Sequence, residues 1–387
     1  MLEKVLKGSP KYYLWLAFLG GIIGIGAITF IFQLQYGLGL TGMNRDASWG
    51  FYIAQFTYLV GIAASAVMLV LPAYFHGYKQ FKKIIIFGEF MAIGAVIMCM
   101  LFIVVDIGMP QRMLNVMLYP TLNSVMFYDM MVLFGYLCLN AIVGWKTLEC
   151  ERFQVAYPNW IKYLIYTSVI WAFSIHTVTA FLSQGLPGRH YWLTAVLAIR
   201  FLASAFCAGP ALLLLLLMIV KKIAKFEIGK EAVKTLTLII TYAMCLNVFL
   251  FLCEVFTAFY SNIPGHMHPL HYLFAGTEAG LPWVTYWMWI GALMAIGSLV
   301  LLIPTSLREN MQILPWALGM LVLATWIDKG LGLIIGGFAP TPFETWATYA
   351  PTVPELLISL GIFGVGALVV SILWKIAIDV KKEAGTL

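Results

Sequence analysis

Seven ionisable side chains interrupt stretches of the chain that are otherwise apolar enough for lipid: Asp106, Asp129, His176, Arg200, Glu254, Asp328 and Lys329. A charged side chain inside hydrocarbon costs at least about 2.5 kcal/mol, so an intramembrane ionisable residue indicates a functional site by default. Histidine can exchange a proton near neutral pH. Counting along each apolar stretch places all seven toward one membrane face, which predicts proton-linked chemistry close to that face.

The composition of the 387-residue chain requires a membrane around these stretches. Hydrophobic residues make up 62% and charged residues 10%, whereas soluble domains have roughly 25% charged residues. The apolar residues form runs long enough to cross a hydrocarbon core of about 30 Å, which takes roughly 20 helical residues. Because these runs are continuous rather than alternating, an all-α polytopic membrane protein is predicted. Ten expected helices begin near Tyr12, Gly50, Lys83, Ser124, Trp160, Tyr191, Thr235, Trp283, Met311 and Pro354.

The distribution of Lys and Arg predicts the orientation. With the N-terminus in the cytoplasm, only Arg45, Arg112 and Arg189 fall in outer connections. Cytoplasmic loops retain positive charge, so this bias predicts insertion in the cell membrane with both termini in the cytoplasm. The net charge of +6 follows from the same bias and from anionic lipid, which gives no reason to expect nucleic acid. The cytoplasmic set is Lys4, Lys7, Lys11, Lys79, Lys82, Lys83, Lys146, Arg152, Lys162, Lys221, Lys222, Lys225, Lys230, Lys234, Arg308, Lys375, Lys381 and Lys382.

The whole chain, residues 1–387, is predicted to be one membrane domain with an internal repeat. Expected helices two to five and six to nine form two four-helix bundles, residues 50–185 and 191–336, flanked by helices one and ten. This order is typical of a parallel repeat. The polar connections, such as Ser261 to Pro282, are too short for a soluble domain. In this register the matched positions are Asp106 with Glu254 and His176 with Asp328.

Residues that hold redox centres are not found at suitable positions. A haem between helices usually needs paired histidines, and only His176 sits well inside an expected helix. The cysteines have no iron–sulfur spacing, so we expect no haem, iron–sulfur cluster or metal in this chain. Contact with a partner protein is favoured over metal binding for the outer histidines, His266, His268 and His271. The cysteines are Cys99, Cys138, Cys150, Cys207, Cys245 and Cys253.

The glycine run from Gly20 to Gly26 superficially resembles a nucleotide-binding loop. It follows no strand and lies in the middle of an expected helix, so a phosphate-binding turn is not favoured. Small residues four apart let transmembrane helices approach closely. We therefore expect close helix packing through Gly20 and Gly24.

Three of the embedded polar residues are candidates for proton handling. Asp106 lies near the outer end of its helix, where it could act on protons or simply pair with Arg112. Asp129 lies about one turn into the next helix, where a purely structural role is harder to explain. His176 suits proton exchange with a hydroquinone, although a satisfied core histidine is a comparable alternative.

Arg200 and four other charged residues extend this polar set. Arg200 keeps its charge and needs a carboxylate partner, for which the order of preference is Asp129, Asp106, Glu254. Asp328 and Lys329 are adjacent, and residues one apart on a helix do not face each other, so each is expected to have another partner. Glu254 is a candidate proton carrier. For Glu89, snorkelling to the cytoplasmic surface is favoured over proton entry.

Several motifs resemble those of the polysulfide reductase NrfD family of quinone-interacting membrane subunits, over essentially the whole chain. The matching stretches are Asp106–Arg112 with Pro120, Asn123–Ser124 and Tyr128–Asp129, then Trp49–Gly50, Ser174–Thr177, Leu186–Arg189, Arg200–Ala205 and Gly209–Ala211. Within the family, the ten-helix form and the block from His176 to Pro210 look most like the DsrP (HmeB) branch, the membrane subunits of DsrMKJOP complexes in sulfur-metabolising prokaryotes.

This resemblance implies a function and a set of partners. Family members carry no prosthetic group, bind menaquinone near the outer face of the first four-helix bundle and exchange electrons with an iron–sulfur protein docked there. The DsrP branch implies an outer ferredoxin-like iron–sulfur subunit, a multihaem cytochrome c, a b-type cytochrome and a cytoplasmic iron–sulfur subunit related to heterodisulfide reductase, acting in dissimilatory sulfur metabolism such as sulfate reduction. The first-helix quinone contacts of shorter members have no match in Tyr12–Gln35.

The resulting hypothesis is a menaquinol site near Trp49, Tyr128, Asp129, His176 and Arg200. Asp129, His176 and Asp106 would handle protons and Arg200 would stabilise negative charge. Quinol oxidation or quinone reduction is then assigned to the complex, not to the isolated chain. A second hypothesis is proton movement through Glu89, Glu254, Asp328 and Lys329. The alternatives are a secondary ion or solute transporter, disfavoured because no helix is expected to break at its centre, and a structural anchor.

Overall fold

The structure is a computed structural model that describes residues 1–63, 66–75, 77–224, 227–278 and 280–385. Lys225 of the expected cytoplasmic set lies outside these described residues. Regular secondary structure in the described part is helical, apart from one isolated bridge between Thr277 and Gly280. The predicted all-α fold is therefore confirmed.

In the described residues, 10 helical spans are long and apolar enough to cross a membrane. They are α1 Pro10–Tyr36, α2 Phe51–Ala63 with α3 Val67–Phe75, α4 Ile85–Asp106, α6 Val125–Phe153, α7 Asn159–Gln184, α8 Val196–Ala224, α9 Lys230–Tyr260, α11 Trp283–Leu302, α13 Leu314–Thr325 with η7 Trp326–Gly332 and α14 Leu333–Gly337, and α15 Val353–Glu383. The short elements are η1 Leu2–Leu6, η2 Leu38–Leu40, η4 Lys79–Phe81, η5 Pro110–Arg112, α5 Asn115–Leu118, η6 His190–Trp192, α10 Pro264–Phe274 and α12 Thr305–Arg308.

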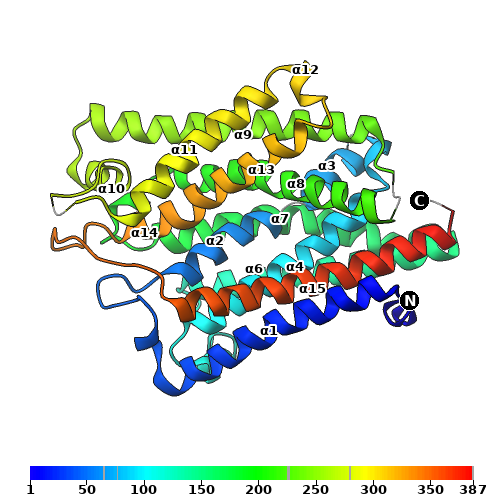
Figure 1. The fold of residues 1–387 in the computed structure, drawn as a ribbon, viewed down its shortest axis with the longest axis horizontal. Coiled ribbons are helices and arrows are strands. Elements are labelled where there is room, and N and C mark those ends of the chain that lie inside the picture. The colour runs from blue at the N-terminus through cyan, green and yellow to red at the C-terminus, as the bar shows by residue number, and fades with distance from the viewer. Residues whose placement is uncertain (64–65, 76, 225–226, 279, 386–387) are drawn as a thin grey trace.

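The long helices run roughly along one axis, and both chain termini lie at the same end of it (Figure 1). An ion pair between Lys4 and Glu383 joins the two terminal segments there. We call this end the terminal end and the opposite end, which carries α10 and the segment from 107 to 124, the far end. An even number of spans places the two termini on one side, as the sequence predicts.

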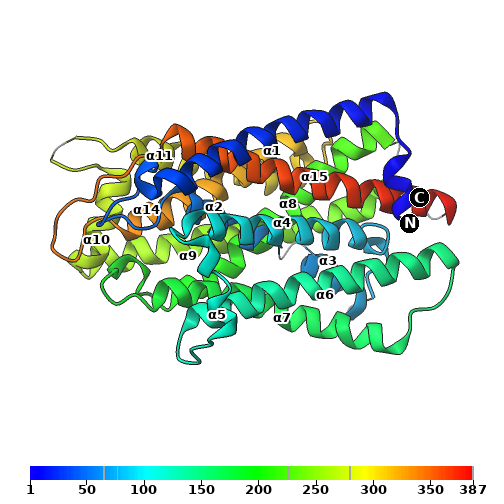
Figure 2. The same ribbon diagram turned by 90° about the horizontal axis from the view of Figure 1, so that it is seen from below.

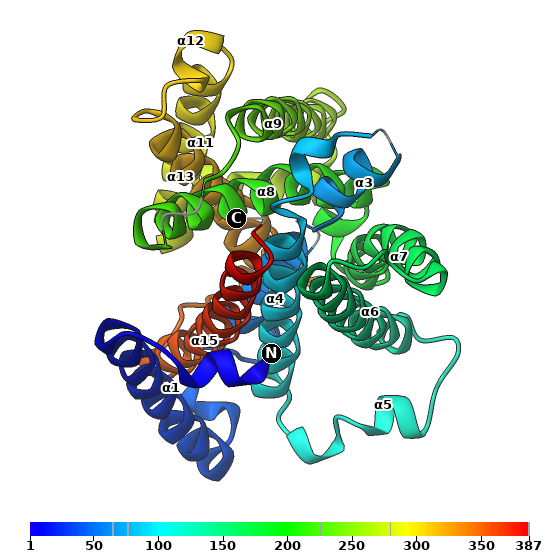
Figure 3. The ribbon, with the colours of Figure 1, turned by 90° about the vertical axis from the view of Figure 1, so that its right-hand side faces the viewer.

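The helices pack in two neighbouring sets. α2, α4, α6 and α7 form one set, α8, α9, α11 and α13 form the other, and the two meet where α2 and α7 contact α8 and where α2 contacts η7. Figure 2 shows α1 and α15 on the opposite side of the molecule from α6 and α7. In the view onto the terminal end, α5 and its loop are set off to one side of α4 and α6 (Figure 3).

The flanking helices α1 and α15 pack against each other, and α15 also packs against α4. The close approach uses Gly26 and Gly361, because a Cβ added at Gly26 would lie 2.6 Å from the Gly361 Cα. Gly20 and Gly24 have nothing within 4 Å of an added Cβ. The sequence expectation for these two residues is therefore wrong, since they lie on the helix face turned away from α15.

Several element boundaries differ from the sequence prediction, and two of them have a clear structural reason. The stretch from Ser261 to Pro282, expected as a connection, contains α10, which begins at Pro264. Proline is favoured at the first helical position, and α10 buries Leu270 and Leu273. The helix expected from Tyr191 begins at Val196, because the preceding residues form η6 with Tyr191 buried in the core.

Candidate functional site

Asp129 lies in the wall of an apolar cavity at the far end. Its side chain is buried on α6, and the Thr179 hydroxyl of α7 donates a hydrogen bond to Oδ1 at 2.6 Å. The cavity has a volume of about 310 Å³. Methionine and isoleucine side chains dominate its lining, with Arg112 as the only basic residue among those that line it: Ile103, Ile107, Met109, Arg112, Met113, Val116, Met126, Asp129 and Met130.

This cavity borders the lipid-facing surface. Met109 and Met126 line it and are 52% and 57% exposed. They come from the segment after α4 and from the first turn of α6, on the side where α5 stands apart from the helices (Figure 3). The cavity is thus bordered on its exposed side by methionine side chains, which are flexible and adapt readily to a ligand.

Asp106 ends α4 beside a second buried carboxylate. The charges of Asp106 and Glu355 are near enough to interact, and Asp106 Oδ1 has no hydrogen-bond partner within the described residues. Neither an ion pair nor a hydrogen bond joins Asp106 to Arg112 in that part of the chain. The alternative that Asp106 simply pairs with Arg112 is therefore not favoured.

Glu355 organises the far end. Its side chain is fully buried and accepts hydrogen bonds at 2.8 Å from the backbone N–H of Gly42, from the backbone N–H of Thr352 and from the Tyr349 hydroxyl. Thr352 and Glu355 also cap α15 reciprocally, which satisfies two N–H groups of the first turn. The Tyr349 hydroxyl accepts a hydrogen bond from the Phe51 N–H at 2.6 Å, so this network fixes the start of α2.

His176 lies in dry packing on α7. The side chain is 0% exposed, and neither ring nitrogen has a hydrogen-bond partner among the described residues. It does not line the cavity beside Asp129. Lys329 is near enough to act on the His176 ring electrostatically, which links α7 to the second helix set.

Arg200 is paired with two carboxylates of the second helix set. Its Nη1 donates to Glu254 on α9, and its Nη2 donates to both carboxylate oxygens of Asp328 at 2.9 Å. The Arg200 side chain is only 6% exposed. The preference for Asp129 or Asp106 as its partner is therefore wrong, because those carboxylates belong to α6 and α4 in the first set.

Lys329 and Asp328 have separate partners, as the sequence predicts. Lys329 is buried, its Nζ donates to the Phe201 carbonyl oxygen at 3.3 Å, and it lies 4.3 Å from the Phe201 ring centroid. Both residues lie in η7, a π-helical segment of seven residues. The span from Leu314 to Gly337 continues through this segment without a break, and π-helical segments often occur at functional sites.

Trp49 and Tyr128 do not meet Asp129 across one pocket. The Trp49 ring centroid lies 5.6 Å from that of Trp192 and 6.0 Å from that of Phe338, and the Arg189 guanidinium lies 4.2 Å above Phe338. Tyr128 is 45% exposed, and its ring packs against the ring of Phe127 on α6. The structure thus divides the residues expected to surround one ligand among three places.

Glu89 is buried near the terminal end of α4. It is 3% exposed, and its Oε2 has no hydrogen-bond partner within the described residues. The same oxygen would lie 3.3 Å from a Cβ added at Gly144 of α6. The expectation that Glu89 snorkels to the surface is therefore wrong, because its side chain points between helices.

A second far-end cavity of about 280 Å³ adjoins Glu254 and is also lined by Tyr191 and His266. Burial and the neighbouring His190 lower the pKa of His266, so this imidazole stays neutral near pH 7. The other outer histidines have different contacts, with His268 3.2 Å from Glu344 and His271 against Phe259. Among the described residues, no group of three possible ligands is placed to hold a metal ion.

Comparison with known proteins identifies the family. Residues 39–340 match the family model described as Polysulphide reductase, NrfD. The chain belongs to this family. It is accordingly an integral, multi-pass membrane protein, in agreement with its apolar spans.

Relatives of this NrfD-family chain cover most of its length. It is 26% identical to a putative dimethyl sulfoxide reductase membrane subunit of Halobacterium salinarum, over 92% of this chain and 89% of that protein. It is 24% identical to a selenate reductase subunit of Mesobacillus selenatarsenatis, over 93% and 92%. It is 21% identical to an Hdr-like menaquinol oxidoreductase integral membrane subunit of Archaeoglobus fulgidus, over 79% and 74%.

Sequence reasoning missed several polar residues of this NrfD-family chain. Thr179 and Asn247 look like ordinary helix residues, and only the packing shows that they face other helices. Tyr52 donates to Gln33 at 2.7 Å, which ties α2 to α1. Glu355 could have been found, because a threonine three residues before a glutamate at a helix start is a capping signal.

Proposed function

We propose that this NrfD-family chain is the membrane subunit of a respiratory oxidoreductase complex that exchanges electrons and protons with menaquinol at its far end. The observation that supports this most directly is a buried carboxylate, Asp129, in the wall of an apolar cavity that borders lipid. Relatives named as a menaquinol oxidoreductase subunit and as reductase subunits support the same class of complex.

The cavity beside Asp129 fits a quinone head group. A dry cavity of about 150 Å³ is enough for one benzene ring, and this one has about 310 Å³. Its apolar lining suits a fused ring, while Asp129 offers an acceptor for a hydroxyl and Arg112 offers donors for a carbonyl oxygen. Menaquinone, when bound, supplies the two-electron, two-proton chemistry.

Asp129 and Asp106 have successive roles in proton transfer. Thr179 holds Asp129 through one hydrogen bond, which leaves carboxylate lone pairs free for a ligand hydroxyl. Asp129 then accepts a proton. Asp106 lies at the end of α4, its Oδ1 has no hydrogen-bond partner among the described residues, and it is the next acceptor toward the far end. Trp49, Tyr128, His176 and Arg200 do not line this cavity and have no part in this proposal.

The cellular setting is part of this proposal. The terminal end faces the cytoplasm, because the Lys and Arg residues gather on that side of the expected topology. Electrons pass to an outer ferredoxin-like iron–sulfur subunit docked at the far end. By resemblance to the DsrP branch, the further partners are a multihaem cytochrome c, a b-type cytochrome and a cytoplasmic iron–sulfur subunit, and the pathway is dissimilatory sulfur metabolism.

The experiment tests quinone binding by the purified full-length chain in lipid nanodiscs. The Asp129→Asn variant removes a charged acceptor and should raise the Kd for menaquinone-4 hydroquinone about tenfold, the effect of losing one hydrogen bond to a charged group. Glu149→Gln, on the same helix α6 near the terminal end, is the matched control and should leave the Kd unchanged. Equal affinities in wild type and Asp129→Asn would remove Asp129 from the site.

Proton movement across the membrane is a second candidate, favoured by Glu89 and Glu254, each of which has one carboxylate oxygen without a hydrogen-bond partner among the described residues. The proposed proton route runs between Glu89 and Glu254. Asp328 and Lys329 would lie along it, because η7 contacts both helix sets. In proteoliposomes of the intact complex, Glu89→Gln should abolish proton uptake in excess of quinone chemistry while electron transfer continues. If the wild-type complex takes up no excess protons, this candidate fails. Uptake of an ion or solute without quinone would instead indicate a transporter.

A further inference from the structure

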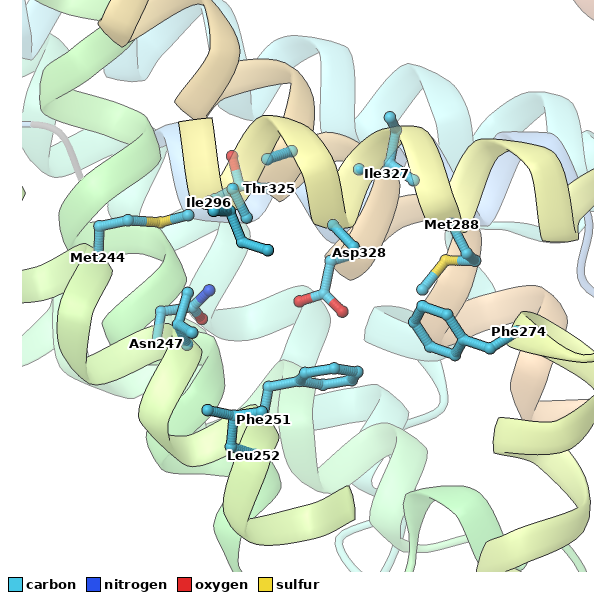
Figure 4. A pocket seen from close by; sticks show the side chains of 15 residues that line it. Met244, Asn247, Phe251, Leu252, Phe274, Met288, Ile296, Thr325, Ile327 and Asp328 are labelled. Atoms are coloured by element: carbon cyan, nitrogen blue, oxygen red, sulfur yellow. The ribbon is translucent and has the colours of Figure 1, made fainter. Parts of the chain in front are cut away.

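A third cavity lies in the second helix set, away from the site beside Asp129. Its volume is about 240 Å³, and it is bounded by α9, α10, α11, α13 and η7. Figure 4 shows the Asp328 carboxylate projecting among the labelled side chains, with Asn247 on one side and Phe274 and Met288 on the other. Nearly all other lining residues are apolar.

Two acceptor groups are buried in this apolar cavity. Asn247 is 5% exposed, and its Oδ1 has no hydrogen-bond partner within the described residues. Asp328 is held by Arg200, yet each carboxylate oxygen keeps a further lone pair for a donor. An unmade hydrogen bond at a buried acceptor is costly, so these two groups favour an occupant that brings O–H donors.

The cavity borders the lipid. Leu252 on α9 and Ile296 on α11 line it and are 56% and 60% exposed. These two side chains flank the space between α9 and α11, on the surface that apolar spans present to hydrocarbon. A ligand therefore enters sideways from the membrane and must itself be soluble in lipid.

The size and polarity of the cavity select one class of occupant. About 150 Å³ holds a benzene ring, so 240 Å³ has room for a fused ring. A phospholipid head group is disfavoured because its phosphate would lie among apolar side chains and be repelled by Asp328. A fatty acid carboxylate would be repelled by Asp328, whereas a hydroquinone carries two O–H donors for Asp328 and Asn247. A long apolar tail would leave between Leu252 and Ile296.

We propose that this cavity between α9 and α11 is a second binding site for a prenylated hydroquinone. The inference rests on the proposed function for the identity of the ligand, but it concerns a separate site. Asp328 accepts a hydrogen bond from one hydroxyl and Asn247 from the other, while Phe251 and Phe274 enclose the ring. Each chain then holds two hydroquinones, one in each helix set.

The test uses the full-length chain in nanodiscs, freed of native quinone and loaded with a photoactivatable naphthohydroquinone. Peptide mapping is expected to find label in 244–252 or 288–296 as well as around Met109 and Met126. Ala292→Phe fills the cavity and should abolish the first label, whereas Leu293→Phe, a lipid-facing neighbour with a 66% exposed side chain, should keep it. Label retained around Met109 in Ala292→Phe shows that the variant is folded.

A second variant tests the hydrogen bond itself. Asn247→Leu keeps the side-chain size but removes the acceptor, and it should raise the Kd of the second site about tenfold. Native mass spectrometry under reducing conditions counts bound menaquinone-4 hydroquinone, with two per wild-type chain and one per Ala292→Phe chain expected.

The possible outcomes separate the two sites. Label around Met109 alone, or label near α9 that Ala292→Phe leaves intact, overturns the second site and leaves the proposed function in place. A phospholipid or fatty acid that quinone does not displace also overturns it. Label in the second cavity alone supports this inference and contradicts the site beside Asp129. No label in either cavity overturns both.

Discussion

The two buried side chains Asp129 and Arg200 differ in whether a partner of opposite charge neutralises them. Arg200 has two carboxylate partners, Glu254 and Asp328, so most of its charge is neutralised locally. Asp129 has the neutral Thr179 hydroxyl as its partner and lies beside an open volume. A carboxylate with little neutralisation next to a ligand-sized space is suited to proton exchange, whereas a neutralised cluster stabilises the packing of helices.

This difference predicts the effect of removing Arg200. Arg200→Met leaves Glu254 and Asp328 buried without their cation and should lower the free energy of unfolding by about 3–5 kcal/mol. The measurement is reversible unfolding of the full chain in mixed micelles. The triple variant Arg200→Met, Glu254→Gln, Asp328→Asn should recover much of the loss, because no uncompensated charge remains. An equal loss in the single and triple variants would mean that the cluster acts through packing alone.

Among the elements, α1 and η7 differ most from a regularly packed, regular α-helix. α1 touches the rest of the protein mainly through α15, and only its Gly26 face comes close. η7 interrupts the span from Leu314 to Gly337 and directs Asp328 and Lys329 to different partners. In α1, Gly26 determines which helix can pack closely, and in η7 the π-helical geometry determines which side chains Asp328 and Lys329 contact.

The glycine contact predicts a position-specific effect on α1. Gly26→Leu places side-chain atoms against the Gly361 backbone and should cost about 1–3 kcal/mol through overpacking. Gly24→Leu, on the same helix with open space around it, is the matched control and should not destabilise the chain. Thermal unfolding of both variants in detergent measures the difference. Equal midpoints would show that α1 can shift along α15 without loss.

For the whole molecule, each helix set has a cavity that adjoins a carboxylate toward the far end. The cavities beside Asp129 and Glu254 open there, one in each set. The internal repeat of 50–185 and 191–336 remains a prediction, and the similar order of packing in the two sets supports it. This arrangement agrees with the proposal that lipid-soluble ligands bind at the far end and that a redox partner docks on the adjoining loops.

The orientation prediction can be tested in intact cells. Thr121→Cys lies in the exposed far-end segment and should react with a membrane-impermeant maleimide added from outside. Asn159→Cys, exposed at the terminal end, should react only after the membrane is permeabilised. Both results follow if the Lys-rich side is cytoplasmic. Reaction of Asn159→Cys alone in intact cells would mean that the chain is inserted the other way.

The sequence by itself determined the membrane class, the spans and the family. Burial in lipid is a property of each run of about 20 residues, because transfer free energies add along a local segment. For that reason the predicted starts at Ser124, Trp160 and Pro354 lie within one residue of the observed helices. The stretch from Asp106 to Arg112 likewise carries its family signal in consecutive residues, without reference to packing.

Only the tertiary structure decided which side chains meet. Arg200 pairs with Glu254 and Asp328, which lie 54 and 128 positions further along the chain. Such pairing depends on the rotation of each helix about its axis. Successive helical residues point about 100° apart, so a small change in rotation exchanges one partner for another. The burial of Glu89, the contact of Glu355 with Gly42 and the Gly26 contact were decided in the same way. Hydropathy along the chain carries no information about that rotation, whereas packing between helices fixes it.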